Sequence, residues 1–298
     1  MKKLVLIDSN ALIHRAYHAL PDLKTKQGQL VNAVYGFISI LFRIIQDLKP
    51  DYLVATFDLA GPTFRDLQYK DYKAKRIKPP QEFYDQIPLI KELVKALNIP
   101  IYEKQGFEAD DLIGTIATKI KNQPACRRGR ESKIKNIIIT GDLDVLQLVN
   151  KQTQVYALRK GIKDIMIYDI KAVRERYGLT PEQMIDFKGL KGDPSDNIPG
   201  VPGIGEKTAI DLVKKFGSLE KLYQKLQESD LSFKLKARLL EYQEQAFLSR
   251  DLATIKKDVP INFDLEKCFW GEFNQTEVIK LLEKLEFKSL IKRLSVIK

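Results

Sequence analysis

Short β-rich runs that alternate with helical patterns constrain the fold of this chain more than any other feature. The runs are Leu4–Asp8, Tyr52–Asp58, Ile99–Glu103 and Asn136–Thr140. The helical patterns between them cover Ala33–Gln46, Gln86–Leu97 and Asp110–Lys121. Because buried strands separated by helices form parallel sheets covered on both faces, we predict an α/β domain with a mostly parallel sheet.

The pattern changes past Lys151. Gln154–Leu158 and Asp164–Tyr168, on either side of Lys160-Gly161, predict a β-hairpin. From Lys171 onward the chain is almost entirely helical in pattern, with Gly and Pro residues between about 189 and 205. A chain of 298 residues suits two domains, each with its own core. We therefore predict an α/β domain over 1–170 and a helical domain over 171–298.

Charge and composition narrow the class of protein. Lys and Arg number 50 against 39 Asp and Glu, a net charge of +11, which favours a polyanionic partner and nucleic acid first. Two cysteines argue against a disulfide scaffold or a Cys-rich zinc site. His14 and His18 lie four apart on a predicted helix, which indicates ordinary surface or packing. No apolar run approaches the ~20 residues of a membrane span, so we expect a soluble, cytoplasmic protein with no membrane partner.

Acidic residues follow three of the predicted strands. Asp8 ends the first run, Asp58 ends the second, and Asp142 follows the fourth. A single aspartate at such a position is often a helix N-cap. In open α/β sheets, however, ligands bind outside the carboxyl ends of the strands. Three acids there predict a shared crevice.

Three acidic clusters add to this set. Glu108–Asp111 begins a helix, where the helix dipole alone favours one or two acids. Asp142–Asp144 can present two carboxylates on one face of an extended segment, and Gly192–Asn197 by itself would suggest a plain turn. An all-oxygen set suits Mg²⁺ or Mn²⁺, and so many acids favour a two-metal site for phosphodiester hydrolysis. The nine candidate ligands are Asp8, Asp58, Glu108, Asp110, Asp111, Asp142, Asp144, Asp193 and Asp196.

A basic segment over 63–80, called here the basic arm, follows Asp58. It contains six cations interleaved with Phe64, Tyr69 and Tyr72. Cations neutralise phosphates and aromatic rings stack on unpaired bases, as on single-strand binding surfaces. Lys70 and Lys73 have helical spacing, so the polar face of a helix is the alternative. The position directly after Asp58 favours nucleic-acid binding.

The glycine-rich segment 198–209 is a second candidate binding element. It is not a P-loop, because Glu206 separates Gly205 from Lys207 and no strand precedes it. Gly200, Gly203 and Gly205 permit tight turns, and the following helix points free N–H groups at a phosphate. Together with Lys207, this predicts a helix-hairpin-helix-type element that grips duplex DNA without reading its sequence.

A further basic segment lies at 121–135. Its charges and its Pro and Gly residues indicate an exposed loop. A solvated surface loop and a binding loop both remain open for it.

At this point the sequence closely resembles the 5′-nuclease (flap endonuclease) family, in particular the 5′–3′ exonuclease domain at the front of bacterial DNA polymerase I. The resemblance extends nearly from end to end. The motifs are Val5–Asp8, His14–Leu20, Ala33–Phe37, Tyr72–Arg76, Glu108–Asp111, Gly192–Asn197 and Gly200–Ala209.

The resemblance implies a PIN-like nuclease domain with a helical arch over the active site. It also implies a helix–three-turn–helix (SAM-fold-like) module that binds duplex DNA and often a K⁺ ion. The nine acids match the metal-binding carboxylates of the family. Lys73 and Arg76 match arch residues that contact the scissile phosphate, and Arg15 matches a further phosphate-region arginine. Tyr72 is the expected stacking partner of a flipped nucleotide, and Lys70 an expected substrate contact.

The function implied is a divalent-metal-dependent, structure-specific 5′–3′ exonuclease and flap endonuclease. It acts on 5′ ends and 5′ flaps of DNA and on RNA primers paired to DNA, in primer removal and repair. The expected chain is a nucleoid-associated monomer with a DNA polymerase domain in cis or in trans. Two alternatives stay open: a non-catalytic junction-binding accessory protein and an RNA-directed PIN-type ribonuclease.

Overall fold

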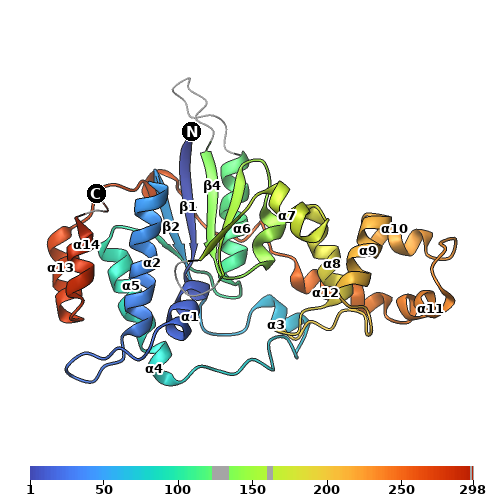
Figure 1. Ribbon diagram of the computed structural model, residues 1–298, viewed down its shortest axis with the longest axis horizontal. Coiled ribbons are helices and arrows are strands. Elements are labelled where there is room, and N and C mark those ends of the chain that lie inside the picture. Colours follow the sequence, from blue (N-terminus) through green and yellow to red (C-terminus); the bar gives the residue numbers. More distant parts are fainter. Residues whose placement is uncertain (123–133, 160–163, 296, 298) are drawn as a thin grey trace.

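The computed structural model describes residues 1–122, 134–159, 164–295 and 297. Over these residues, six strands form one sheet in the order β3-β2-β1-β4-β5-β6 (Figure 1). All neighbouring strands are parallel except β5 and β6, which pair antiparallel. The predicted mostly parallel sheet and the hairpin strands are therefore confirmed. The strands are β1 (Lys2–Asp8), β2 (Tyr52–Thr56), β3 (Ile101–Tyr102), β4 (Ile134–Thr140), β5 (Thr153–Leu158) and β6 (Ile165–Tyr168).

Helices cover both faces of the sheet, because alternate strand residues point to opposite sides. Leu6 of β1 belongs to the same apolar cluster as Ile113 of α6. Its neighbour Ile7 belongs to the opposite cluster, with Phe37 of α2. The helices around the sheet are α1 (Ser9–Ala19), α2 (Asn32–Leu48), α5 (Gln86–Ala96), α6 (Ala109–Asn122) and α7 (Ile170–Tyr177).

The helical part of the chain packs beside the face covered by α6 and α7 (Figure 1). Helix α8 contacts both α9 and α12. Apolar residues of this part, such as Leu190 and Leu212, belong to one cluster with Leu4 and Leu6 of the sheet. The helices are α8 (Met184–Lys191), α9 (Glu206–Phe216), α10 (Leu219–Lys225), α11 (Phe233–Glu241) and α12 (Gln243–Ala253).

The last two helices return to the first part of the chain. Helices α13 (Gln275–Lys284) and α14 (Lys288–Leu294) contact α5 and α2, at the opposite end of the molecule from α9 (Figure 1). Leu282 and Leu290 lie in the apolar cluster of α2 and α5. Residues 275–294 therefore pack with the α/β part rather than with the helical part. The boundary near 170 remains a prediction.

The basic arm is not the regular helix suggested by the spacing of Lys70 and Lys73. Residues 69–80 form turns and irregular chain between two short helices, α3 (Phe64–Gln68) and α4 (Gln81–Tyr84). The backbone N–H of Lys73 donates to the carbonyl of Asp196 (2.8 Å), and the side chain of Asn197 donates to the carbonyl of Asp71 (2.7 Å). Lys73 also has a positive φ of 55°. Hydrogen bonds to a distant loop replace those of a helix.

Two sequence features fall wholly or mainly outside the described residues. The central part of the basic segment at 121–135, residues 123–133, is one of them, and Lys160-Gly161 is the other. Within the described ranges, no helix has both the length and the apolar character needed to cross a membrane.

Candidate active site

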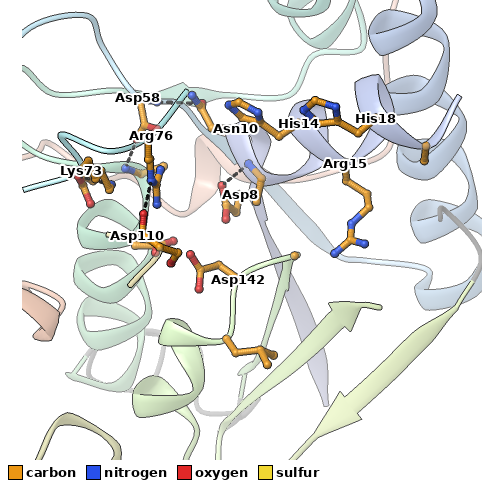
Figure 2. Close-up of a pocket in the computed structure, with 17 residues that line it drawn as sticks. Asp8, Asn10, His14, Arg15, His18, Asp58, Lys73, Arg76, Asp110 and Asp142 are labelled. Atoms are coloured by element: carbon orange, nitrogen blue, oxygen red, sulfur yellow. Dashed lines mark hydrogen bonds and ion pairs between the residues drawn. The ribbon is translucent and has the colours of Figure 1, made fainter. Parts of the chain in front are cut away.

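A cavity of about 670 Å³ opens at the carboxyl ends of β1, β2 and β4 (Figure 2). The chain adds β2 and β3 on one side of β1 and then β4, β5 and β6 on the other. The cavity lies at this change of direction, which is the usual ligand position in open α/β sheets. Helix α1 contributes polar side chains along one side, and the arm contributes Lys73 and Arg76. Five carboxylates line it, namely Asp8, Asp58, Glu108, Asp110 and Asp142.

Asp8 links the two central strands to α1. Its Oδ1 accepts a hydrogen bond from the backbone N–H of Ala11 (3.0 Å), which caps α1. Its Oδ2 accepts one from the hydroxyl of Thr140 (2.6 Å), whose oxygen in turn accepts from the backbone N–H of Asp142 (2.9 Å). Burial raises the pKa of Asp8 to about 6, despite these hydrogen bonds.

Asp58 and Asp110 place acids from β2 and α6 on the same cavity. Asp58 Oδ1 accepts from the backbone N–H of Ala109 (2.6 Å), and its own N–H donates to Asn10 (3.0 Å). Asp110 Oδ1 is buried and has no hydrogen-bond partner among the residues that the structure describes. Burial, and then repulsion from Asp8 and Asp142, raise the pKa of Asp110 well above its usual range. A buried unpaired carboxylate oxygen is costly, and a bound cation would remove that cost.

The donor set fits a hard divalent cation with retained water. Among the residues that the structure describes, no three His, Cys, Asp or Glu side chains converge tightly enough to enclose an ion alone. Mg²⁺ needs no such cage, because it keeps several waters and binds through one or two carboxylates and substrate phosphates. The carboxylate oxygens of the lining, with that of Asp110 among them, therefore suit Mg²⁺ or Mn²⁺.

Four of the nine predicted ligands do not line the cavity; each is paired with a cation of the chain. Asp111 pairs with Arg65, and Asp196 pairs with Arg76. The ammonium of Lys188 lies between Asp144 (2.6 Å) and Asp193. These acids are Asp111, Asp144, Asp193 and Asp196.

The two acids paired with Lys188 have pKa values shifted in opposite directions. Burial raises the pKa of Asp144 to about 7, and Asp142 adds to the rise. Burial also acts on Asp193, but Lys188 and Ser195 hold the pKa of that carboxyl below its usual range. Asp144 therefore binds a proton more tightly than Asp193 does.

The arm cations reach the acids directly. Lys73 Nζ lies 2.6 Å from Glu108 Oε1, and Arg76 pairs with Asp196. Burial lowers the pKa of Lys73, but the carboxylates of Glu108 and Asp196 outweigh it and raise the pKa above its usual range. Both cations line the cavity and remain protonated there.

Tyr72 and Lys70, the two further substrate contacts predicted on the arm, differ in exposure. The hydroxyl of Tyr72 donates to Glu108 and Asp196 (3.2 Å each), and only 5% of the residue is exposed. Its ring is therefore covered, whereas a stacking role needs an open face. Lys70 is exposed and does not line the cavity.

Arg15 lines the cavity from α1 but is fixed by the end of β5. Its guanidinium donates to the carbonyls of Leu158 (2.8 Å) and Arg159 (2.6 Å). A Cβ at Gly141 would lie 3.4 Å from Arg15 Nη2. Two backbone carbonyls therefore hold Arg15 at the edge of the cavity.

The glycine turn joins α8 to α9. Gly200 has a φ of 61°, and a Cβ there would lie 2.3 Å from the backbone N of Gly192. Gly203 also has a positive φ, of 77°. Gly205 precedes α9 with no side-chain cap, so the first N–H groups of the helix are not capped, and Lys207 is exposed beside them. This geometry suits an anion at the helix N-terminus.

Sequence reasoning missed several residues around the site. His14 and His18, whose spacing indicated ordinary surface or packing, line the cavity. The centroid of the His14 ring lies 4.4 Å from that of the Phe83 ring. Their i, i+4 spacing on the helix after Asp8 was the available signal. Four further polar residues hold acids of the site through hydrogen bonds or ion pairs, namely Asn10, Arg65, Thr140 and Lys188.

Two family models match the chain over consecutive ranges. Residues 3–178 match the N-terminal resolvase-like domain of 5′–3′ exonucleases, and residues 179–276 match their C-terminal SAM fold. The chain belongs to the 5′–3′ exonuclease family. The resemblance stated from the motifs is thereby confirmed, as is the fold class of a resolvase-like α/β domain with a SAM-fold domain.

Members of this family with high similarity are bacterial polymerases. DNA polymerase I of Bacillus subtilis is 46% identical over 293 residues, which cover 98% of this chain and 32% of the relative. DNA polymerase I of Chloroflexus aurantiacus is 46% identical over 299 residues, covering 98% and 30% respectively. The chain thus spans about a third of the length of these relatives.

Solved structures share the fold at lower identity. The 5′-exonuclease of T5 with bound divalent metal ions (zinc) superposes with a TM-score of 0.70 at 19% identity, covering 100% of both chains. The catalytic core of Rad2 in complex with DNA substrate gives a TM-score of 0.63 at 16% identity, covering 99% of this chain and 91% of the other. Both nucleases support the fold of this member of the family.

Proposed function

We propose that this chain is a structure-specific 5′ nuclease that hydrolyses phosphodiester bonds at 5′ ends and 5′ flaps of DNA and in RNA primers paired to DNA. One observation carries the proposal: five carboxylates, including the unpaired buried Asp110, line one cavity together with Lys73 and Arg76. Acids bind the catalytic cations, and the arm cations bind the phosphate. Primer removal and DNA repair are the processes that need this reaction.

Divalent ions, which we propose to be two Mg²⁺, would be held by the five lining carboxylates and by the acids paired with Lys188 and Arg76. When bound, such ions make a water nucleophilic at neutral pH and stabilise the leaving oxygen. Lys73 and Arg76 neutralise the scissile phosphate, and Arg15 supports it from α1. Thr140 fixes the orientation of Asp8 through its 2.6 Å hydrogen bond.

DNA would occupy two parts of the molecule. The glycine turn and Lys207 bind the backbone of the duplex, with a K⁺ ion as a further component there. The 5′ single strand passes along the basic arm into the cavity. We further propose a monomer that acts in the cytoplasm, at the nucleoid, with a DNA polymerase domain in cis or in trans.

A labelled flap substrate tests this proposal. The full chain with Mg²⁺ should release the 5′ flap of a DNA duplex, and EDTA should abolish the release. Asp110→Asn should remove cleavage and keep flap binding. Uncut flap DNA with bound protein would favour a junction-binding accessory protein, whereas cleavage of single-stranded RNA in preference to the flap would favour an RNA-directed nuclease.

A further inference from the structure

A buried ion pair lies directly behind the acids of the cavity. Arg65 is 3% exposed and Asp111 is 0% exposed, and neither lines the cavity. Arg65 Nη1 lies 2.7 Å from Asp111 Oδ2, and Nη2 lies 2.9 Å from Oδ1. This is the parallel, two-bond geometry in which a guanidinium and a carboxylate interact most strongly.

The hydrogen-bonding capacity of Asp111 is used within the protein. Besides the two bonds from Arg65, Oδ1 accepts from the backbone N–H of Lys256 (2.8 Å), and Oδ2 accepts from that of Glu108 (3.1 Å). Four donors fill the sites that a carboxylate offers. Its neighbour Asp110 differs, since Asp110 Oδ1 is buried and accepts no hydrogen bond from the described part of the chain.

Arg65 connects three segments behind the cavity. It is part of α3, at the beginning of the basic arm, and pairs with the first turn of α6 through Asp111. Its Nε donates to the carbonyl of Leu252 (2.8 Å), and its Nη2 to that of Thr254 (3.0 Å), at the end of α12. Its Nη1 also lies 3.5 Å from Glu108 Oε2, on the carboxylate that Lys73 contacts.

We propose that Asp111 is a positioning residue that acts through Arg65, and not a ligand of the catalytic ions. The pair fixes the backbone and carboxylate of Glu108 and the base of the arm, so that Lys73 meets Glu108 at the cavity. The inference rests on the proposed nuclease function. It also revises the role that family resemblance implies for Asp111.

Asparagine substitutions at the adjacent residues Asp110 and Asp111 distinguish a metal ligand from a positioning residue. Mn²⁺ is titrated into the full chain without DNA by calorimetry, and bound ions are counted by electron paramagnetic resonance. Asp111→Asn should bind as many ions as the wild type, with affinity within about tenfold. Asp110→Asn, the matched control, should bind one ion fewer. Loss of an ion in Asp111→Asn overturns the inference, whereas a wild-type chain that binds no Mn²⁺ overturns the proposed function.

A double-mutant cycle tests whether Asp111 acts through Arg65. Single-turnover cleavage of a 5′ flap should fall about 10- to 100-fold in Arg65→Gln and in Asp111→Asn, with no further fall in the double variant. Additive losses for Arg65 and Asp111 would contradict the inference.

Folding controls keep the cycle interpretable. Arg65→Gln leaves the buried charge of Asp111 unpaired, and Asp111→Asn leaves Arg65 only its longer contact with Glu108 (3.5 Å). The double variant removes both charges, so it should regain part of the lost thermal stability. Rates are compared at a temperature where circular dichroism shows every variant folded. Flap affinity should stay within about threefold of the wild type. A lower melting temperature with an unchanged cleavage rate would mean a purely structural pair, and would also overturn the inference.

Discussion

Burial gives the acids in and beside the cavity unusual proton affinities. Burial raises the pKa of Asp8 to about 6 and that of Asp144 to about 7, and it also raises the pKa values of Asp58, Asp110 and Asp142. These acids bind protons more tightly in the folded chain than in the unfolded one. Without a metal, folded-state stability should therefore fall as pH rises from about 4 to about 7.

A divalent cation should reverse this loss. At pH 8 the acids are ionised and repel one another, so 10 mM Mg²⁺ should raise the melting temperature more than at pH 5, where protons already neutralise them. The rise in the pKa of Asp8 alone corresponds to a free-energy difference of about 3 kcal/mol between its protonated and ionised forms. Differential scanning calorimetry checks this, with NaCl of equal ionic strength as control. Equal gains at both pH values would contradict the prediction.

Lys73 should contribute to turnover more than to affinity. Its ammonium lies 2.6 Å from Glu108, at the point where we place the scissile phosphate. Lys73→Ala should lower the single-turnover rate about 100-fold or more, and change flap affinity less than about fivefold. Lys75→Ala, an exposed cation of the same arm, is the control and should change neither by much. Equal losses of rate and affinity for Lys73→Ala would mean that the arm only binds.

At the residue scale, the sequence correctly predicted the positions of acids that lie at the ends of strands. Asp8, Asp58 and Asp142 follow three parallel strands, and parallel strands end at one edge of a sheet. The sequence could not separate Asp110 from Asp111. Consecutive helix residues point about 100° apart, so one faces the cavity and the other faces Arg65. The register of that helix, and the partner behind it, depend on tertiary packing.

At the scale of elements, the glycine turn offers a matched pair of substitutions. Gly200→Ala places a Cβ 2.3 Å from the backbone of Gly192 at a φ of 61°, whereas Gly205→Ala meets no atom within 4 Å. Gly200→Ala should lower the free energy of unfolding by about 2 kcal/mol or more.

Gly205→Ala should preserve stability but weaken duplex binding, because its methyl group lies where a phosphate approaches the N-terminus of α9. Thermal melts and fluorescence anisotropy with nicked duplex DNA measure both properties. Unchanged binding by a stable Gly205→Ala would contradict a phosphate site at this turn.

The arm shows what the spacing of residues within a segment does not reveal. Helical spacing of Lys70 and Lys73 suggested a helix, because spacing reports only on hydrogen bonds within a segment. The structure instead bonds Lys73 to the backbone of Asp196, 123 positions along the chain. Strand order and the return of α13 onto α5 are long-range features of the same kind. The hairpin of β5 and β6 was predicted because its contacts are local.

At the scale of the whole molecule, charges of opposite sign occupy different places. Setting aside the eight acids proposed as metal ligands leaves 31 of the 39 acids against 50 cations in the rest of the chain. Lys207 lies at the glycine turn, while Lys280 lies on α13 at the other end of the molecule (Figure 1). Lys207 should therefore interact directly with duplex DNA bound at the turn, whereas Lys280 should contribute almost nothing to that binding.

Salt dependence measures this arrangement. Each phosphate neutralised on duplex DNA adds about 0.9 to the slope of log affinity against log salt, so six contacts would give a slope near about −5. Lys207→Ala should reduce the steepness by about 1, since one phosphate contact is lost. Lys280→Ala, which removes the same charge from the far helix, should leave the slope unchanged. Anisotropy titrations of nicked duplex in EDTA, between 50 and 300 mM KCl, give the three slopes. Equal reductions in both variants would show that net charge alone, rather than the glycine turn, holds the DNA.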